Sequence, residues 1–343
     1  MKLFTLCLLF VSSTFAFGQD QTNPGEYMQY FSIENRQIQQ DMWDYTRTIS
    51  HGKSARKVEK TRMTLIETSN KALQKAKQAK GYKGDDTYKE SVVNYFNVVN
   101  LVLREDYAKL VDMEDVAEQS YDLMEAYMLA RELASEKQNE AANKLQAAQK
   151  AFANANNINL IEQDDALSKN MEIAGNVYEH YNAVYLIFFK SFKQEVYLLD
   201  AIGRSDVSSF EQNRETLLAT IEEGKTKLKA LTLYSNDPTM IEATKNLFDF
   251  YTKEVKESSV VLDFFMKQEN FNKVKAAFEQ KKEKDRTQAD VNQYNAAVND
   301  MNTASTTYNA WNERMNKDRA RYIDAWNKTS ENFTAKHIPT KKQ

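Results

Sequence analysis

A dense group of carboxylates between residues 105 and 125 is the part of this sequence best suited to cation chemistry. Glu114, Glu118 and Asp122 follow one another at intervals of four, with Glu125 close by, so a helix would carry all four on one face. Ca²⁺ takes several oxygen ligands at about 2.5 Å, whereas neighbours on a helix face are about 6 Å apart. A second element would have to complete the ligand shell. The alternative is a solvated acidic helix face.

A row of aromatic side chains from Tyr178 to Phe192 is a second candidate site. The residues expected to line a groove for a lipid or an aromatic ligand are Tyr181, Tyr185, Phe188 and Phe192. Grooves of this kind are lined mainly by apolar and aromatic groups. Spacing of three and four is also that of a core stripe on an amphipathic helix, so the same residues fit a purely structural role.

Known catalytic motifs are absent from the sequence. A chain with 8 glycines has no glycine loop for phosphate, no nucleophile elbow and no metalloprotease helix motif. The histidines, His51, His180 and His337, are scattered, and none follows a glutamate by three residues as in di-metal bundles. The one cysteine, Cys7, lies in an N-terminal apolar stretch. We therefore expect no catalytic residue, no cofactor and no enzymatic activity.

The charges are nearly balanced, with 46 basic and 49 acidic residues and a formal net charge of -3. This balance gives no broad positive field for nucleic acid. The lysine-rich run 273–286 is interleaved with Glu279, Glu283 and Asp285, which is typical of a solvated helix face. We expect no nucleic-acid partner.

Residues 1–18 have the pattern of a signal peptide. Lys2 precedes an apolar stretch at 3–11, and the small residues Ala16 and Gly18 fit a cleavage site that leaves Gln19 first. The next most apolar segment, 183–199, is interrupted by charges such as Lys190 and Lys193, so it fits a buried helix. We expect export to the periplasm or the cell surface and no transmembrane segment after signal removal.

Composition and periodicity predict an all-α fold. The chain has 8 glycines and 3 prolines, which leaves long stretches free of helix breakers. Apolar residues such as Phe96, Leu103 and Leu110 recur at sevens, as on one helix face. The predicted breaks lie at 51–52, 81–85, 154–159, 203–206 and 235–238, with a bend expected at 112–115. We expect long antiparallel helices.

The two halves of the chain match at an offset of 152 residues. From Arg62 and Arg214 onward, 12 of 42 positions are identical, against about 3 for random pairing. Identities at the turn, such as Asp85 with Asp237, are not forced by a core pattern. We predict two tandem, duplicated helical bundles, at 19–160 and 161–343; the alternative is two amphipathic helix pairs of similar composition.

Three segments resemble a known family. YKGD at 82–85, REDY at 104–107 and DMEDVAEQSYDLMEAY at 112–127 resemble uncharacterised exported surface proteins of Bacteroidota and spirochaetes. The resemblance is clearest from about residue 82 to residue 160. It implies an exported helical protein and carries no catalytic residues to transfer.

Two functions fit these patterns. The first is a non-catalytic structural or protein-binding helical module at the cell envelope. The second is a periplasmic receptor for a small ligand or a divalent cation, using the aromatic row or the acidic face. A helical pore-forming protein would need a long uncharged hairpin, and Lys190 and Lys193 interrupt the one candidate segment.

Overall fold

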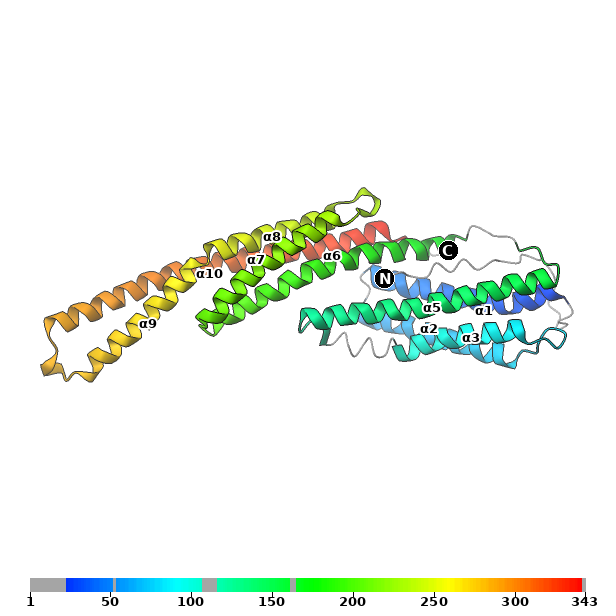
Figure 1. Ribbon diagram of the computed structural model, residues 1–343, viewed down its shortest axis with the longest axis horizontal. Helices are drawn as coiled ribbons and strands as arrows, with labels where there is room; N and C mark the ends of the chain where they lie inside the picture. Colours follow the sequence, from blue (N-terminus) through cyan, green and yellow to red (C-terminus); the bar gives the residue numbers. More distant parts are fainter. Residues whose placement is uncertain (1–22, 52–53, 107–115, 161–164, 341–343) are drawn as a thin grey trace. The chain divides into compact units, whose positions relative to one another are not determined.

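The regular elements of the computed structural model are helices, as the sequence predicted. The structure describes residues 23–51, 54–106, 116–160 and 165–340, and no strand occurs in these ranges (Figure 1). The helices divide into two compact units, Met1–Ala183 with Ser330–Gln343, and Val184–Thr329. The first half of α6 and the end of α10 belong to the first unit.

Unit 1 contains four helices that run antiparallel to one another (Figure 1). These are α1 (Pro24–Ser50), α2 (Ala55–Gln78), α3 (Thr87–Leu101) and α5 (Tyr121–Ala155). Each packs against the next along the chain. After α3 the chain continues as a π-helical turn, Val102–Asp106. The bend expected at 112–115 lies outside the described residues.

Unit 2 is built from five helices. They are α6 (Ala166–Gly203), α7 (Val207–Ala230), α8 (Thr239–Glu257), α9 (Ser259–Gln280) and α10 (Gln288–His337), with α6 and α10 shared between the units. Within this unit α9 and α10 run side by side past the turn between α6 and α7 (Figure 1). None of the helices in the described ranges is both long and apolar enough to cross a membrane.

Helices begin at the predicted turns because acidic side chains satisfy their free N–H groups. Asp206 accepts from the Ser209 amide at 3.0 Å and Asp237 from the Thr239 amide at 3.0 Å. Pro238, expected in the first turn, lies just before α8, which begins at Thr239.

Two turns 152 residues apart share their geometry. The amide and hydroxyl of Thr87 donate to Asp85 at 2.8 and 2.6 Å, and those of Thr239 donate to Asp237 at 3.0 and 2.6 Å. Each turn has two consecutive residues with positive φ, at 83–84 and 235–236. Helices α2 and α7, which precede these turns, also begin and end 152 residues apart.

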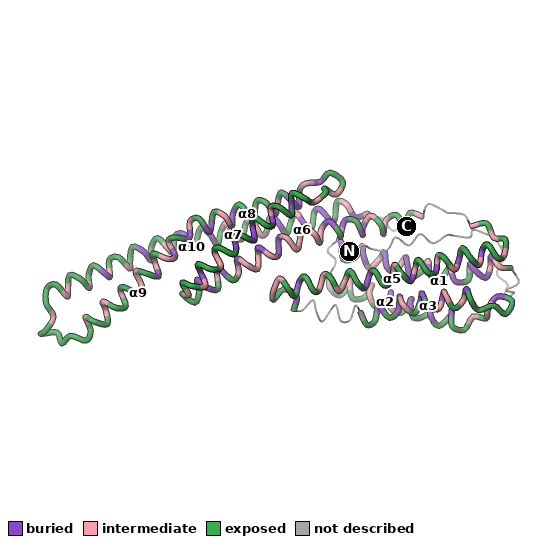
Figure 2. Tube along the Cα trace, in the orientation of Figure 1, coloured by how far each residue is buried: buried purple, intermediate pink, exposed green. Residues whose placement is uncertain are grey.

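Large apolar side chains form a core in each unit, where each fully buried one contributes about 1.5–3 kcal/mol. Trp43 and Phe96 are completely buried in unit 1, and Phe210 and Phe248 in unit 2. In Figure 2 buried and exposed positions alternate along the labelled helices, as the heptad pattern predicted.

Candidate functional site

The core of unit 2 contains three charged side chains in direct contact. Glu195 on α6 and Glu254 on α8 both accept hydrogen bonds from Arg319 on α10, through its Nε and its Nη2. Its Nη1 donates to Asn316 Oδ1. Both carboxylate side chains are 1% exposed and the arginine side chain 12%, so bulk water screens this cluster very little.

Three polar atoms of this carboxylate–guanidinium cluster have no hydrogen-bond partner in the described part of the chain. They are Glu195 Oε2, Glu254 Oε2 and the hydroxyl of Tyr251. A buried polar atom without a partner is costly to folding. Most native cores avoid such atoms, so their concentration here marks the cluster as the most unusual part of the unit 2 interior.

The surroundings of the cluster favour the protonated form of one carboxyl group. Burial, followed by the negative charge of Glu195, raises the pKa of Glu254 to about 8, against the opposing effect of Arg319. Burial also raises the pKa of Glu195, while Arg319 lowers it. Burial and both glutamates raise the pKa of the Tyr251 hydroxyl. The cluster can therefore hold a proton near neutral pH.

The geometry offers proton binding but no route for a substrate. Two buried carboxyl groups could in principle act as an acid and a base. Here both are 1% exposed and held by Arg319, so no reacting group can reach them in this conformation. The arrangement fits a structural or proton-linked role.

Part of the predicted acidic face lies on the surface of unit 1. Glu118, Asp122 and Glu125 are exposed, and Tyr121 donates its hydroxyl hydrogen to Glu125 at 3.0 Å. Glu114 lies outside the described residues. Across the described ranges, no three His, Cys, Asp or Glu side chains gather in a geometry that could hold a metal ion.

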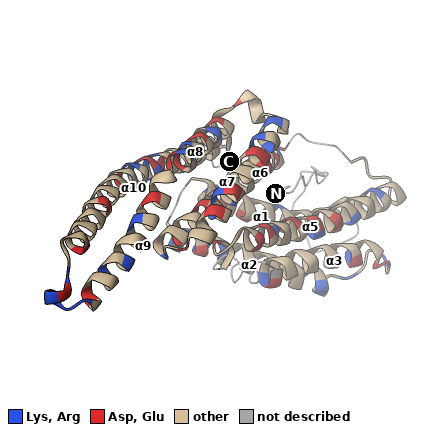
Figure 3. Cartoon of the chain, turned by 60° about the vertical axis from the view of Figure 1, so that its left-hand side comes forward, with Lys and Arg blue, Asp and Glu red and all other residues tan. Residues whose placement is uncertain are grey.

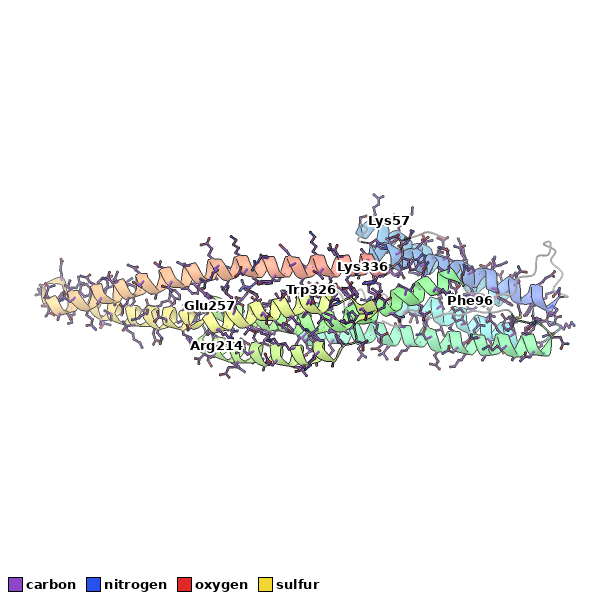
Figure 4. All side chains as sticks on the ribbon, turned by 90° about the horizontal axis from the view of Figure 1, so that it is seen from above. Lys57, Phe96, Arg214, Glu257, Trp326 and Lys336 are labelled. Atoms are coloured by element: carbon purple, nitrogen blue, oxygen red, sulfur yellow. The ribbon has the colours of Figure 1, made fainter. Side chains whose placement is uncertain are left out.

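The predicted aromatic row packs within the protein. Phe188 stacks on Phe192 at 5.7 Å and on Trp326 at 3.8 Å, while Tyr185 stacks on Phe189 at 5.6 Å between ring centroids. Tyr181 lies near Tyr178, in an edge contact at 6.3 Å. These contacts occupy ring faces that a ligand would need, and they correspond to the core-stripe alternative. Figure 4 labels Trp326 among the side chains of α10.

A shallow hollow of about 470 Å³ lies on unit 1 between α2 and α3. It is lined by Lys77, Lys89, Glu90, Val93, Asn94 and Asn97. Lys89 is paired with Asp86 at 2.5 Å. The hollow is open to solvent and brings together few apolar groups, unlike most small-molecule sites.

The α9–α10 hairpin presents a second unusual surface. Phe264 stacks on Tyr308 and Phe278 on Tyr294, each at 4.7 Å, so the two helices pair along an aromatic seam. Residues 291–312 of α10 contain one charged side chain, Asp300, which pairs with Lys267 at 2.7 Å. Figure 3 shows this stretch mostly free of charge colours, whereas α9 carries both signs.

One exposed face of α10 is built from five asparagines and one threonine. Its members, here called the amide stripe, are spaced three or four apart and are Asn292, Asn295, Asn299, Asn302, Thr306 and Asn309. Asparagine is up to about 0.7 kcal/mol less favourable than alanine in a helix. An exposed stripe of this kind therefore weakens the helix that carries it.

Sequence reasoning missed the carboxylate–guanidinium cluster, although a signal was available. Glu195 and Glu254 stand 152 residues after Trp43 and Val102, which are both fully buried. Under the predicted duplication, charged residues at positions that match apolar core residues indicate a buried charge. Comparison of the chain with protein-family models, with curated proteins and with solved structures finds no match.

Proposed function

We propose that this protein is an exported, non-catalytic helical module of the cell envelope that binds a protein partner through the α9–α10 hairpin. The amide stripe of α10 carries the proposal. Its asparagines disfavour the helix in the isolated chain, and their amides each donate and accept hydrogen bonds. Residues that weaken a helix on its exposed face, without an evident gain in stability, are typical of a functional surface.

The chemistry of the hairpin defines the partner. An uncharged stripe can be covered without burying unpaired charges, which is the main penalty at charged surfaces. A partner that places a charge there would leave that charge without a counter-ion. The partner surface is therefore uncharged and polar, and it pairs with the asparagine amides.

The burial of the most perturbed carboxyl groups in the described part of the chain supports a non-catalytic role. The most perturbed carboxyl groups, Glu195 and Glu254, are enclosed in the unit 2 core. The sequence pattern of residues 1–18 and the family resemblance support export.

We also propose that the chain contains a tandem duplication, in which the length of the α9–α10 hairpin is an addition to the second copy. The shared turns and the equal offset of α2 and α7 support it. Buried residues of α5 and α10 correspond at an offset of 181, as in Ala134 with Met315 and Leu145 with Trp326. The offset of 181 exceeds 152 by 29 residues. This extra length corresponds to about two heptads in each arm of the α9–α10 hairpin.

Site-specific photo-cross-linking in the producing cell tests the binding role. A photoreactive residue at Asn299, in the amide stripe, should give a discrete protein adduct. The same photoreactive residue placed at position 222, where Glu222 of α7 is exposed, should give no such adduct. Adding Asn295→Lys and Asn302→Lys should abolish the Asn299 adduct without loss of helicity, because lysine favours helix more than asparagine does.

Equal adducts at Asn299 and Glu222, or an adduct that survives both lysines, would refute hairpin binding. Fractionation of the same cells, with mass spectrometry of the N-terminus, tests export separately. A chain that starts at Gln19 outside the cytoplasm is expected. A cytoplasmic chain that retains residues 1–18 would refute export and leave hairpin binding to be judged by its cross-links.

A further inference from the structure

We propose that Glu195, Glu254 and Arg319 form a proton-operated latch that joins α6, α8 and α10 in unit 2. With one proton held between the two carboxyl groups, the latch is electrically balanced and closed. Loss of that proton leaves two carboxylates facing one guanidinium in a dry core, which weakens the contact among the three helices.

The hydrogen bonds within the cluster favour a proton on one of the two carboxyl groups. Arg319 donates to the Oε1 atom of each glutamate, and both Oε2 atoms have no donor in the described part of the chain. Each carboxyl group also affects the pKa of the other, in part through a side-chain hydrogen bond between them. Ionised carboxylates are acceptors only, so a direct contact between them needs a proton on one.

The charge balance points to Glu254 as the residue that carries the proton. The negative charge of an ionised Glu195 cancels the positive charge of Arg319, and a protonated Glu254 adds no charge. If Glu254 ionises, the cluster has a net charge of −1 in a medium of low dielectric constant, where like charges repel strongly.

Among the described residues, Arg319 is the cation whose charge lowers the pKa of both glutamates. On α8, Lys253 is paired with Asp318 of α10 at 3.2 Å, and the Tyr251 hydroxyl is neutral because its pKa is raised above its ordinary value. On α10, Asn316 contributes an uncharged amide. On α7, Leu217 is fully buried.

The sign of the pH effect follows from the raised pKa. Glu254 has a pKa of about 8 in the folded chain and 4.5 as its ordinary value. The folded state therefore binds the proton more tightly, and the associated stability is complete below pH 4.5 and is lost as pH rises through 8. For one proton, the unfolding equilibrium constant rises at most about tenfold per pH unit within this window.

Weaker contacts at Arg319 would also affect the base of the α9–α10 hairpin, because α10 carries both Arg319 and the amide stripe. This consequence rests on the proposed binding function. The latch itself does not, because it concerns only contacts inside unit 2. A failure of the cross-linking experiment would therefore leave the latch untouched.

Urea unfolding of the full mature chain from pH 5 to pH 9 tests the latch. The Glu254→Gln variant carries a permanent neutral amide and should lose the component that rises up to about tenfold per pH unit. The matched control is Glu223→Gln, because hydrogen bonds from Lys190 and Lys227 lower the pKa of Glu223 to about 2. That control should keep the pH dependence of the wild-type chain.

Infrared difference spectroscopy of the wild-type chain provides a measurement that does not depend on folding of a variant. A carboxylic acid band should be present at pH 7 and disappear above pH 8. Glu254→Gln, if folded, should lack the band. Absence of the band in the wild-type chain at pH 7, or an unchanged pH dependence in Glu254→Gln, would overturn the latch.

Discussion

Trp326 of α10 stacks on Phe188 of α6 with their ring centroids 3.8 Å apart and their planes inclined by 14°. The indole Nε1 also donates to Thr244 Oγ1 of α8 at 3.0 Å. A single side chain therefore ties three helices of unit 2 together. Phe188 is one of the residues that the sequence offered as a ligand site, and its ring is engaged by this contact.

Replacing Trp326 should destabilise unit 2 strongly. Trp326→Ala leaves a large cavity and should lower the free energy of unfolding by about 3–5 kcal/mol. Trp326→Phe keeps a ring against Phe188 and should lose less, because Thr244 still donates to the Met240 carbonyl at 2.9 Å. Urea denaturation followed by circular dichroism measures both. Tyr197→Ala, at a residue 40% exposed, should change stability by less than about 0.5 kcal/mol.

Removing the cation of the carboxylate–guanidinium cluster should lower the free energy of unfolding more than replacing all three charged residues. Arg319→Met leaves a buried carboxylate without a partner and should cost about 3–5 kcal/mol at pH 7. The triple variant Glu195→Leu, Glu254→Leu, Arg319→Met should recover most of that loss, since well-packed apolar residues can replace buried ion pairs. Chemical denaturation of both variants checks this order. A triple variant less stable than Arg319→Met would contradict it.

Replacing Gly224 with alanine should destabilise the protein, whereas replacing Gly203 with alanine should stabilise it. A Cβ at Gly224 would lie 2.7 Å from the ring of Phe248, a fully buried residue that cannot easily move. Overpacking costs about 1–3 kcal/mol and outweighs the gain in helix propensity of about 1 kcal/mol. Gly203→Ala meets nothing within 4 Å and should stabilise by about 0.5–1 kcal/mol. Differences in thermal midpoint test the pair; a stabilised Gly224→Ala would refute the packing argument.

The turn before α8 should depend on the Asp237 carboxylate. Asp237→Ala removes the acceptor for the Thr239 amide and hydroxyl and should lower the free energy of unfolding by about 1 kcal/mol. Asp237→Asn retains an oxygen acceptor and should lose less. Denaturation at pH 7 compares the two, and equal losses would show that the amide oxygen cannot replace the carboxylate.

The sequence by itself determined the helices and most of their ends. Asp206 and Asp237 act on amides two or three residues away, so their effect is local and readable from neighbouring residues. The scarcity of glycine and proline acts in the same way. Fold class therefore followed from short-range chemistry.

Tertiary packing decided which polar residues lie inside. Glu195, Glu254 and Arg319 are separated by tens of residues, and each alone looks like an ordinary charged residue of an amphipathic helix. Only the packing of α6, α8 and α10 brings them into contact. The same packing set Phe188 against Trp326, because helical spacing shows which residues share a face but not what that face meets.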